Sequence, residues 1–299
     1  MTASQTRART DRGGARQTST WTSAGGGRPP ATGRVLTYAL LVALSILVLA
    51  PVVWAALSSF KTQTELAQRP PALLPHSLST ANYSGALQSF HFTTYLKNSV
   101  LVTVGATVLT LAINTMAAYG LAKYNFRGRN FLFLVTLGTI MIPLQIILIP
   151  VYQVAASLHL VNSLWGLIIP PAATPTGVFL LRQYMLGLPD DLIEAARIDG
   201  AGEFRIFLRV IVPLCGAPIA VLTIFSVIWR WNDFLWPLII SQDQDKYTLP
   251  VALAQFNSEL VVPFNYILAM SVVSMLPVVI IFLVLQRHIV RGIANTGLR

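Results

Sequence analysis

Charged side chains are scarce in this sequence, so the few that fall beside apolar stretches mark where chemistry could occur. Residues 229–236 combine three tryptophans with Arg230, Asn232 and Asp233. Arg230 and Asp233 are three residues apart, so on a helix they share a face and can pair. An ionisable pair at membrane depth usually faces protein or water rather than lipid. We therefore expect either a structural pair at the membrane interface or part of a solute route formed by Trp229, Arg230, Asn232 and Asp233.

Asn114 is a second polar candidate, because it lies within the charge-free stretch 98–122. Polar side chains in such stretches often hydrogen-bond between helices. Asn114 is therefore a candidate for helix packing or, alternatively, for the same solute route. Aromatic faces together with hydrogen-bonding groups would suit a sugar, because its C–H faces stack on rings and its hydroxyls need polar partners.

A third polar group lies in residues 188–213, a segment much longer than a simple turn. Asp190 or Asp191 can cap the start of a helix. Glu194 and Arg197 are three residues apart and can pair on its surface. The apolar residues between them supply a stripe, so the sequence predicts a short amphipathic helix here.

This first helix is expected to end at Gly200, because glycine permits the left-handed backbone that terminates a helix. Glu203 then starts a second helix, and Pro213 suits the first turn of the span that follows. The small residues Ala195 and Ala196 would let another surface approach closely. From periodicity alone, the two helices could lie on lipid headgroups, which their amphipathicity favours, or dock against a protein partner.

Other kinds of site receive no support from the sequence. Cys215 is the single cysteine, and the four histidines are scattered, so no metal site is expected. No cluster of His, Cys or acidic residues has catalytic spacing, so we expect no catalytic residue and no enzyme. No Gly-rich loop followed by Lys-Ser/Thr occurs, so the chain is not expected to bind ATP by itself.

The elements that must position these residues are apolar helices. Hydrophobic residues make up 54% of the chain and charged residues 11%, against about 25% charged in ordinary globular domains. A helical crossing needs about 20 apolar residues, and backbone groups in lipid must be satisfied within the segment. The charge-free stretches predict an all-α membrane protein with six spans, near residues 35–57, 99–122, 131–152, 164–181, 214–238 and 266–286. Prolines in the third and fourth spans are expected to kink them or to line a cavity.

The loop charges predict the orientation, because Lys and Arg concentrate on the cytoplasmic side. One side carries sixteen basic residues, in the N-terminal tail, residues 123–129, residues 182–209 and the C-terminus. The opposite loops carry four: Lys61, Arg69, Lys97 and Lys246. Both termini and the 188–213 segment are therefore expected in the cytoplasm of a bacterial-type cell, with the chain a multi-pass protein of the plasma membrane.

The net charge of +10 does not indicate a nucleic-acid partner, because these charges flank the spans, where they set topology and contact anionic lipid. Residues 1–34 are rich in Ser, Thr, Gly and Arg and are expected to form a disordered, basic cytoplasmic tail. The apolar run after this tail exceeds a signal-peptide core, which favours its retention as a span over cleavage near Ala56 or Ser58.

The spacing in residues 194–213 resembles the cytoplasmic motif of binding-protein-dependent ABC importer permeases. That motif has Glu-Ala-Ala, three residues, Gly, nine residues and an apolar-x-apolar-Pro ending. Its positions here are Glu194, Ala195, Ala196, Asp199, Gly200, Val210, Val212 and Pro213. The family favours Ile and Leu where this chain has Val210 and Val212. The resemblance implies that the coupling loop (residues 188–213) docks in a cleft of an ATPase.

The likeness extends over residues 35–299, the expected transmembrane domain, and is closest to the six-span carbohydrate permeases of maltose-like systems. Its further matches include Asn98-Ser99, Trp231-Asn232-Asp233-Phe234 and Tyr247-Thr248-Leu249-Pro250. It implies a second permease, two ATPase subunits that bind ATP and Mg, and an external solute-binding protein. The solute stays open between a sugar, oligosaccharide or polyol and a non-sugar such as glycerol phosphate. An ion-coupled secondary transporter is the competing class, and it would need buried carboxylates or histidines in the spans.

Overall fold

The computed structural model describes residues 31–70, 72–89, 91–258 and 263–296. These residues form helices and loops without a strand, which confirms the all-α class for them. The chain divides into two compact units, residues 1–50 and 51–299. The expected tail, 1–34, lies outside the described residues except for 31–34, which already belong to α1 (Ala31–Ser58).

Three helices are long and apolar enough to cross a membrane: α1, α4 (Phe92–Lys123) and α15 (Phe264–Thr296). They contain the first, second and sixth predicted spans. The number rises to five if each of two bent helix pairs crosses as one unit. The presence of apolar spans is therefore confirmed, whereas six crossings and the orientation of the termini stay predictions.

The third and fourth predicted spans are wrong as single helices. α5 (Arg129–Ile140) and α6 (Leu144–Ser157) meet at 109°, with Pro143 immediately before α6. The fourth predicted span is divided into α7 (Leu164–Ile168) and α8 (Pro175–Leu186). Proline lacks the N–H that would continue the helical ladder. The expected kinks are thus confirmed, and they are complete breaks.

The fifth predicted span, 214–238, also differs from the structure. α12 (Gly216–Trp231) ends seven residues earlier and follows a bend of 80°. The remaining described helices are short: α2 (Gln63–Ala67), α3 (Ala81–Ser89), α9 (Asp191–Ile198), α10 (Glu203–Ile206), η1 (Phe207–Ile211), α11 (Val212–Leu214), α13 (Leu235–Ile240), η2 (Gln244–Lys246) and α14 (Leu249–Ser258).

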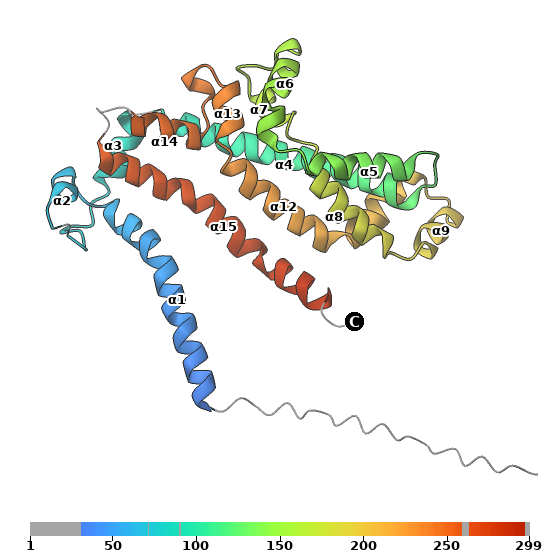
Figure 1. Ribbon diagram of the computed structural model, residues 1–299, viewed down its shortest axis with the longest axis horizontal. Helices are drawn as coiled ribbons and strands as arrows, with labels where there is room; N and C mark the ends of the chain where they lie inside the picture. The colour runs from blue at the N-terminus through green and yellow to red at the C-terminus, as the bar shows by residue number, and fades with distance from the viewer. Residues whose placement is uncertain (1–30, 71, 90, 259–262, 297–299) are drawn as a thin grey trace, which may run out of the picture. The chain divides into compact units, whose positions relative to one another are not determined.

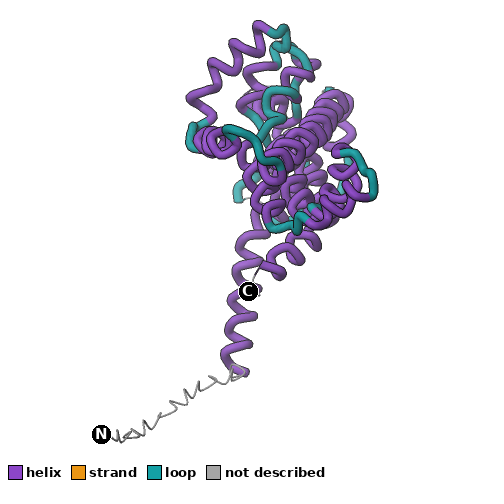
Figure 2. The backbone as a smooth tube through the Cα atoms, turned by 90° about the vertical axis from the view of Figure 1, so that its right-hand side faces the viewer, coloured by secondary structure: helices purple, strands orange, loops and turns teal. Residues whose placement is uncertain are grey.

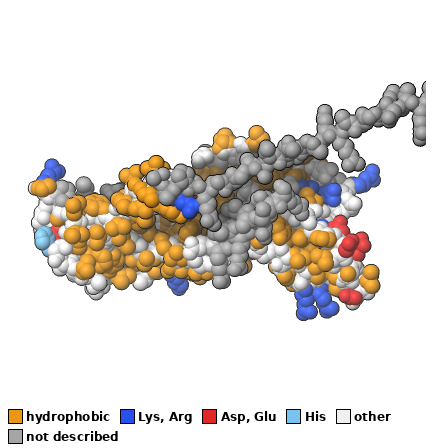
Figure 3. Space-filling view, turned by 90° about the horizontal axis from the view of Figure 1, so that it is seen from below, with side chains coloured by type: hydrophobic (Ala, Val, Ile, Leu, Met, Phe, Trp, Pro, Cys, Tyr) orange, Lys and Arg blue, Asp and Glu red, His pale blue; other side chains and the backbone are white. Residues whose placement is uncertain are grey.

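The helix α4 is central to the packing of residues 51–299, where it lies against α8 and α12 (Figure 1). Figure 2 shows that the described elements are helices joined by loops. α12 in turn packs on α15, and α15 on α3. Outward-facing side chains on α5 and α15 are largely apolar, among them Phe131, Leu134 and Ile280. Figure 3 shows broad apolar surface on this face, and the acidic side chains visible in this view lie mainly at its right-hand end. An exposed apolar surface of this extent suits lipid or a partner rather than water.

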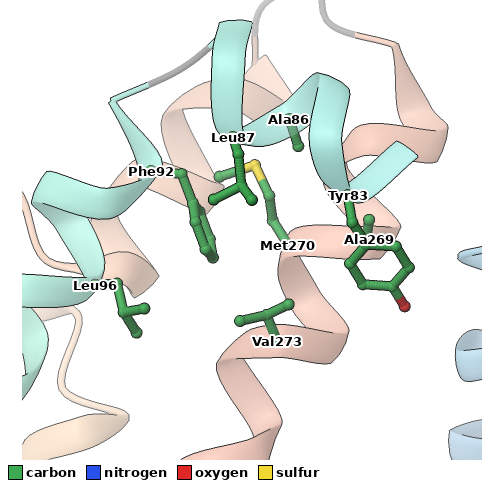
Figure 4. Close-up of a pocket in the computed structure, with 8 residues that line it drawn as sticks. All are labelled: Tyr83, Ala86, Leu87, Phe92, Leu96, Ala269, Met270 and Val273. Carbon is green, nitrogen blue, oxygen red and sulfur yellow. The ribbon is translucent and has the colours of Figure 1, made fainter. Parts of the chain in front are cut away.

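A pocket between α3, α4 and α15 illustrates how apolar this packing is (Figure 4). Its eight lining residues are Tyr83, Ala86, Leu87, Phe92, Leu96, Ala269, Met270 and Val273. The one hydroxyl among them, on Tyr83, points away from the labelled neighbours and lies 2.6 Å from Ser59 Oγ. The pocket therefore offers no hydrogen-bonding group to a sugar, whose hydroxyls would lose their water partners on entry.

The short helix α2 starts at a capping box between Thr62 and Glu65. Glu65 N donates to Thr62 Oγ1 at 3.3 Å, and Thr62 N donates to Glu65 Oε2 at 2.7 Å. His76 N donates to the other carboxylate oxygen at 3.0 Å. These backbone N–H groups of Thr62 and His76, and then the His76 ring, lower the pKa of Glu65 to about 2 from its ordinary value of 4.5.

The loop between α2 and α3 is expected to loosen at acidic pH. A carboxylate with a lowered pKa in the folded state contributes stability that is complete above 4.5 and is lost as the pH falls towards 2. Hydrogen exchange at His76 N–H, corrected for intrinsic rates, should show falling protection over that range. Glu65→Gln should show weak protection that does not vary with pH. A pH-independent wild type would contradict this assignment.

Candidate functional site

The coupling loop folds as two short helices joined by a glycine turn, as predicted. α9 ends at Ile198, and Gly200 has a left-handed φ of +78°. Gly200 N donates to Arg197 O at 3.0 Å, and Ala201 N donates to Ala196 O at 3.0 Å. This pair of bonds is the Schellman ending of a helix, in which the left-handed residue is usually glycine because it has no Cβ. The turn therefore fixes the direction in which the chain leaves α9.

One face of the two helices is buried and holds the loop in place. Ile193 and Ile206 are 4% and 0% exposed. They belong to an apolar cluster with residues of α4 and α8 that include Ala118, Leu181 and Met185. Burying an aliphatic side chain of this size contributes about 1.5–3 kcal/mol each. The loop is thus a structured part of the helical body.

A second apolar surface of the loop remains outside. Leu192, Ile198 and Phe204 are 43%, 86% and 69% exposed. Ala195 is also exposed, and Ala196 is partly buried. Apolar side chains exposed together on a rigid unit mark an interaction surface more often than a solvated one. This surface has the small and apolar residues that close approach of another surface requires.

Two predicted details of the loop are wrong. Asp190 precedes α9 without capping it, because its carboxylate accepts a bond of 2.6 Å from Lys123 Nζ. Arg197 does not pair with Glu194; its Nε donates to Glu203 Oε1 at 2.7 Å. The partners of Asp190 and Arg197 both lie outside α9. Lys123 is at the end of α4, beside the start of α9, and the glycine turn brings Glu203 back to Arg197.

The end of the motif, Val210 to Pro213, continues the second helix through a π-helical turn, η1. Val212 N donates to Phe207 O, five residues earlier. Pro213 has no N–H to donate to the carbonyl of Arg209, so the regular ladder cannot continue there. Pro213 lies in α11, near the end of the helical stretch Glu203–Leu214, and not in the first turn of the predicted fifth span, whose helix α12 begins at Gly216. The chain then bends by 80° into α12.

Of the five solute-route residues, Asn114 lies on α4, and the other four lie at or just after the end of α12. Asn114 is fully buried, and its amide bonds Thr174: Nδ2 donates to Oγ1 at 2.5 Å, and Thr174 N donates to Oδ1 at 3.1 Å. These bonds attach α4 to the start of α8. Asn232 is exposed and donates to Ile228 O at 2.8 Å.

The predicted Arg230–Asp233 pair is wrong, because no ion pair joins them in the described part of the chain. Arg230 instead donates to the carbonyl of Pro171, in the break between α7 and α8. Trp229 is 49% exposed and lines a groove between α8 and α12. The lining residues are Thr176, Gly177, Phe179, Leu180, Leu222, Phe225 and Trp229.

Several residues that fix this geometry were missed by sequence reasoning. Lys123 donates to Leu188 O at 2.6 Å as well as to Asp190, and Tyr124 donates to the Glu203 carboxylate. Lys123 appeared only as a topology charge. A usable signal was its place directly after a charge-free span, where a basic side chain can bond the carbonyls at a neighbouring helix end.

Comparison with known proteins decides the family. Residues 113–295 match the model of the family described as "Binding-protein-dependent transport system inner membrane component". The chain belongs to this family. The matched region contains the whole coupling loop, α8 and the end of α4 on which the loop packs, so the resemblance in residues 194–213 is confirmed at the level of the family.

Similar proteins agree with this assignment. The permease AraQ of an arabinooligosaccharides transport system from Halalkalibacterium halodurans is 35% identical over 90% of this chain and 98% of its own length. The diacetylchitobiose permease NgcG of Streptomyces coelicolor is 33% identical over 88% of each chain. The glycerol-3-phosphate permease UgpE of Agrobacterium fabrum is 29% identical over 88% and 96%. This inner-membrane component is therefore an ABC permease that resembles sugar permeases.

A solved structure shares the fold. The chain matches one chain of a bacterial ABC transporter that imports the acidic polysaccharide alginate, with a TM-score of 0.79 and 25% identity. The match covers 86% of this chain and 96% of the other. The helical architecture of this chain is therefore that of an ABC permease fold.

Proposed function

We propose that this chain is one of two permease subunits of an ATP-driven importer in a bacterial plasma membrane, and that it moves a carbohydrate. The assignment of a carbohydrate solute is supported by two relatives named for oligosaccharide uptake, which are 35% and 33% identical over most of the chain. An external binding protein would deliver the solute, as the family's description implies. ATP and Mg would be bound by two separate ATPase subunits.

The single observation that carries the proposal is the exposed apolar surface of the coupling loop, built on a fixed turn within a matched family region. We assign α9 as the helix that docks in the ATPase. The residues assigned to docking and its geometry are Glu194, Ala195, Ala196, Asp199, Gly200, Val210, Val212 and Pro213. The excess of Lys and Arg on the same side supports a cytoplasmic position for this loop and for both termini.

For the solute route, Trp229 has the strongest support. Its exposed ring lies 5.9 Å from that of Phe225, beside Thr176 in the groove between α8 and α12. Rings and a hydroxyl together suit a saccharide, whose C–H faces need apolar contact. Arg230, Asn232 and Asp233 lie at the end of the same helix. Asn114 supports the route indirectly, by fixing the start of α8.

An ion-coupled secondary transporter has less support. Lys61, Glu65 and Arg182 are buried among the described residues, and the side chain of Lys123 is buried as well. Glu65 belongs to the short helix α2, outside the apolar spans, so none of these four residues supplies a titratable carboxylate within a span. A glycerol-phosphate solute is the stronger alternative, because UgpE is nearly as similar as the saccharide permeases.

Uptake by the complete importer tests these assignments. The chain is reconstituted in proteoliposomes with its second permease, ATPase subunits and binding protein, with ATP inside the vesicles. We expect ATP-dependent uptake of labelled arabinotriose or diacetylchitobiose that persists when ionophores remove ion gradients. Uptake of sn-glycerol 3-phosphate alone would overturn the carbohydrate assignment. Uptake that does not require ATP and is abolished by ionophores would overturn the ABC mechanism.

A further inference from the structure

The docking helix α9 is held at its C-terminal end by a polar cluster that the family assignment does not explain. Glu203 is the centre of this Glu203 cluster, which also contains Arg197, Tyr119 and Tyr124. One carboxylate oxygen accepts from Arg197 Nε at 2.7 Å. The other accepts from the Tyr124 hydroxyl and, at 3.5 Å, from the Tyr119 hydroxyl. Residues from α9, α10 and the end of α4 thus meet at one carboxylate.

The N-terminal end of α9 is held to the same part of α4. Lys123 Nζ donates to Leu188 O and to Asp190 Oδ1, both at 2.6 Å. The Lys123 side chain is only 5% exposed, so its ammonium is directed by these two acceptors. Residues 119–124 of α4 therefore contact the chain both before and after the docking helix.

The hydrogen bonds at the two ends of α9 fix its rotation and register, which the apolar cluster beneath the helix does not. Apolar contact depends on buried area and allows one helix to slide or rotate on another. Hydrogen bonds weaken steeply when their angle changes, so they fix rotation and register. The Arg197–Glu203 pair is 47% exposed on each side and so contributes little to stability. Its effect is on orientation.

The protonation states suit this arrangement. The bond from Arg197, and then that from Tyr124, lowers the pKa of Glu203 below its ordinary value. Desolvation, and then the Glu203 carboxylate, raises the pKa of the Tyr124 hydroxyl. At neutral pH the carboxylate is therefore charged and accepts, while the tyrosine keeps its proton and donates.

The opposite end of α4 is attached by polar bonds as well. Asn98 Nδ2 donates to Asp245 O at 2.8 Å and to Tyr247 O at 3.0 Å, and Leu249 N donates to Ser99 Oγ at 2.8 Å. About 37 Å of helix separates Asn98 from Lys123 at 1.5 Å per residue. One continuous helix therefore joins the coupling loop to the segment between α13 and α14.

We propose that Glu203 is a positioning residue that attaches the docking helix to α4, so that a displacement of α9 moves α4 as a unit. The sequence neighbours of α9 are α8 and α10; α4 is reached only through space, by these side chains and the apolar cluster. Without the Glu203 bonds, the motion would be absorbed within the loop. This inference rests on the proposed docking of α9 against an ATPase.

Spin labels test the attachment without knowledge of the solute. In the complete importer, with Cys215→Ala as background, labels are placed at Arg127 and Asp191, which are both exposed. The distance distribution should be the same in the nucleotide-free and ATP–vanadate-trapped states of the wild type. In Glu203→Gln, the two states should give different distance distributions. If Glu203→Gln only weakened the fold, the distance distributions of both states would broaden equally, and that result would overturn the inference.

The second measurement is the amount of ATP hydrolysed for each solute molecule transported. In proteoliposomes with labelled arabinotriose, diacetylchitobiose or sn-glycerol 3-phosphate, Glu203→Gln should raise the ATP hydrolysed per solute by at least about 5-fold. Tyr124→Phe, which removes one hydroxyl, should change this ratio in the same direction, and the two changes together should be less than additive. Arg205→Gln is the matched control on α10 and should keep the wild-type ratio.

The two proposals fail in different ways. A wild-type ratio in both Glu203→Gln and Tyr124→Phe, while Gly200→Pro abolishes ATPase association, would overturn the positioning role and leave docking intact. ATPase association that survives Gly200→Pro would overturn docking itself. The ATPase subunits retained on the purified permease pair give this measurement directly.

Discussion

A Gly200→Pro chain is expected to insert in the membrane and to lose ATP-driven uptake by about 100-fold or more. Gly200 has a φ of +78°, whereas proline is fixed near −65°. Proline also removes the N–H that Gly200 donates to Arg197 O. A misplaced proline costs about 3 kcal/mol or more, which corresponds to roughly 100-fold in an equilibrium constant. The turn between α9 and α10 must therefore refold, and the docking surface loses its geometry.

Neighbouring substitutions separate backbone geometry from bulk. No atom lies within 4 Å of a Cβ added at Gly200, so the restriction there is conformational. Asparagine tolerates the left-handed region, and Gly200→Asn should keep most uptake. Gly202 has φ −70° and ψ 155°, which proline adopts readily. Gly202→Pro, two residues along the same loop, is therefore the matched control and should transport normally.

The measurement combines uptake with membrane content and ATPase retention. Each variant is quantified in the membrane fraction first, so that lost uptake is not lost protein. We expect Gly200→Pro to be present and inactive, and to retain few ATPase subunits. Normal uptake by a correctly inserted Gly200→Pro chain would refute the docking assignment.

The coupling loop was predictable from sequence because its determinants are local. A glycine that ends a helix acts through its own backbone, and Gly200 takes the left-handed conformation just after α9, as predicted. The ion pairs were not predictable by the same means. Arg197 has acidic residues at two suitable separations, Glu194 and Glu203, and only the folded turn selects the second.

The spans show the complementary limit of sequence reasoning. A charge-free stretch reports that a segment is compatible with an apolar environment, and it does not report that the helix is straight. The 52 charge-free residues from Asn130 to Leu181 were predicted as two spans and form four helical pieces. Pro143, Pro170 and Pro171 lie at the breaks, whereas Pro150 lies within α6, so prolines alone do not locate a break. The angle of 109° between α5 and α6 depends on tertiary packing that no local pattern encodes.

Asn114→Leu is expected to destabilise the protein by about 1–3 kcal/mol, the range for leaving a buried hydrogen-bonding group without its partner. Leucine has a similar size but cannot bond Thr174, whose N–H and hydroxyl both contact the Asn114 amide. Because Thr174 immediately precedes α8 as its N-cap residue, the loss should loosen the attachment of α8 to α4. The midpoint of denaturation in detergent measures the change.

Thr110→Val provides the matched control, one turn away on the same face of α4. Thr110 is also fully buried, but its hydroxyl has no partner among the described residues. Removing an unpaired buried hydroxyl should leave stability unchanged or raise it slightly. Comparison of the two variants, Asn114→Leu and Thr110→Val, also decides the role of Asn114. A packing role requires Asn114→Leu to lower the midpoint, whereas a solute-route role requires lost uptake at an unchanged midpoint, and the bonds to Thr174 favour packing.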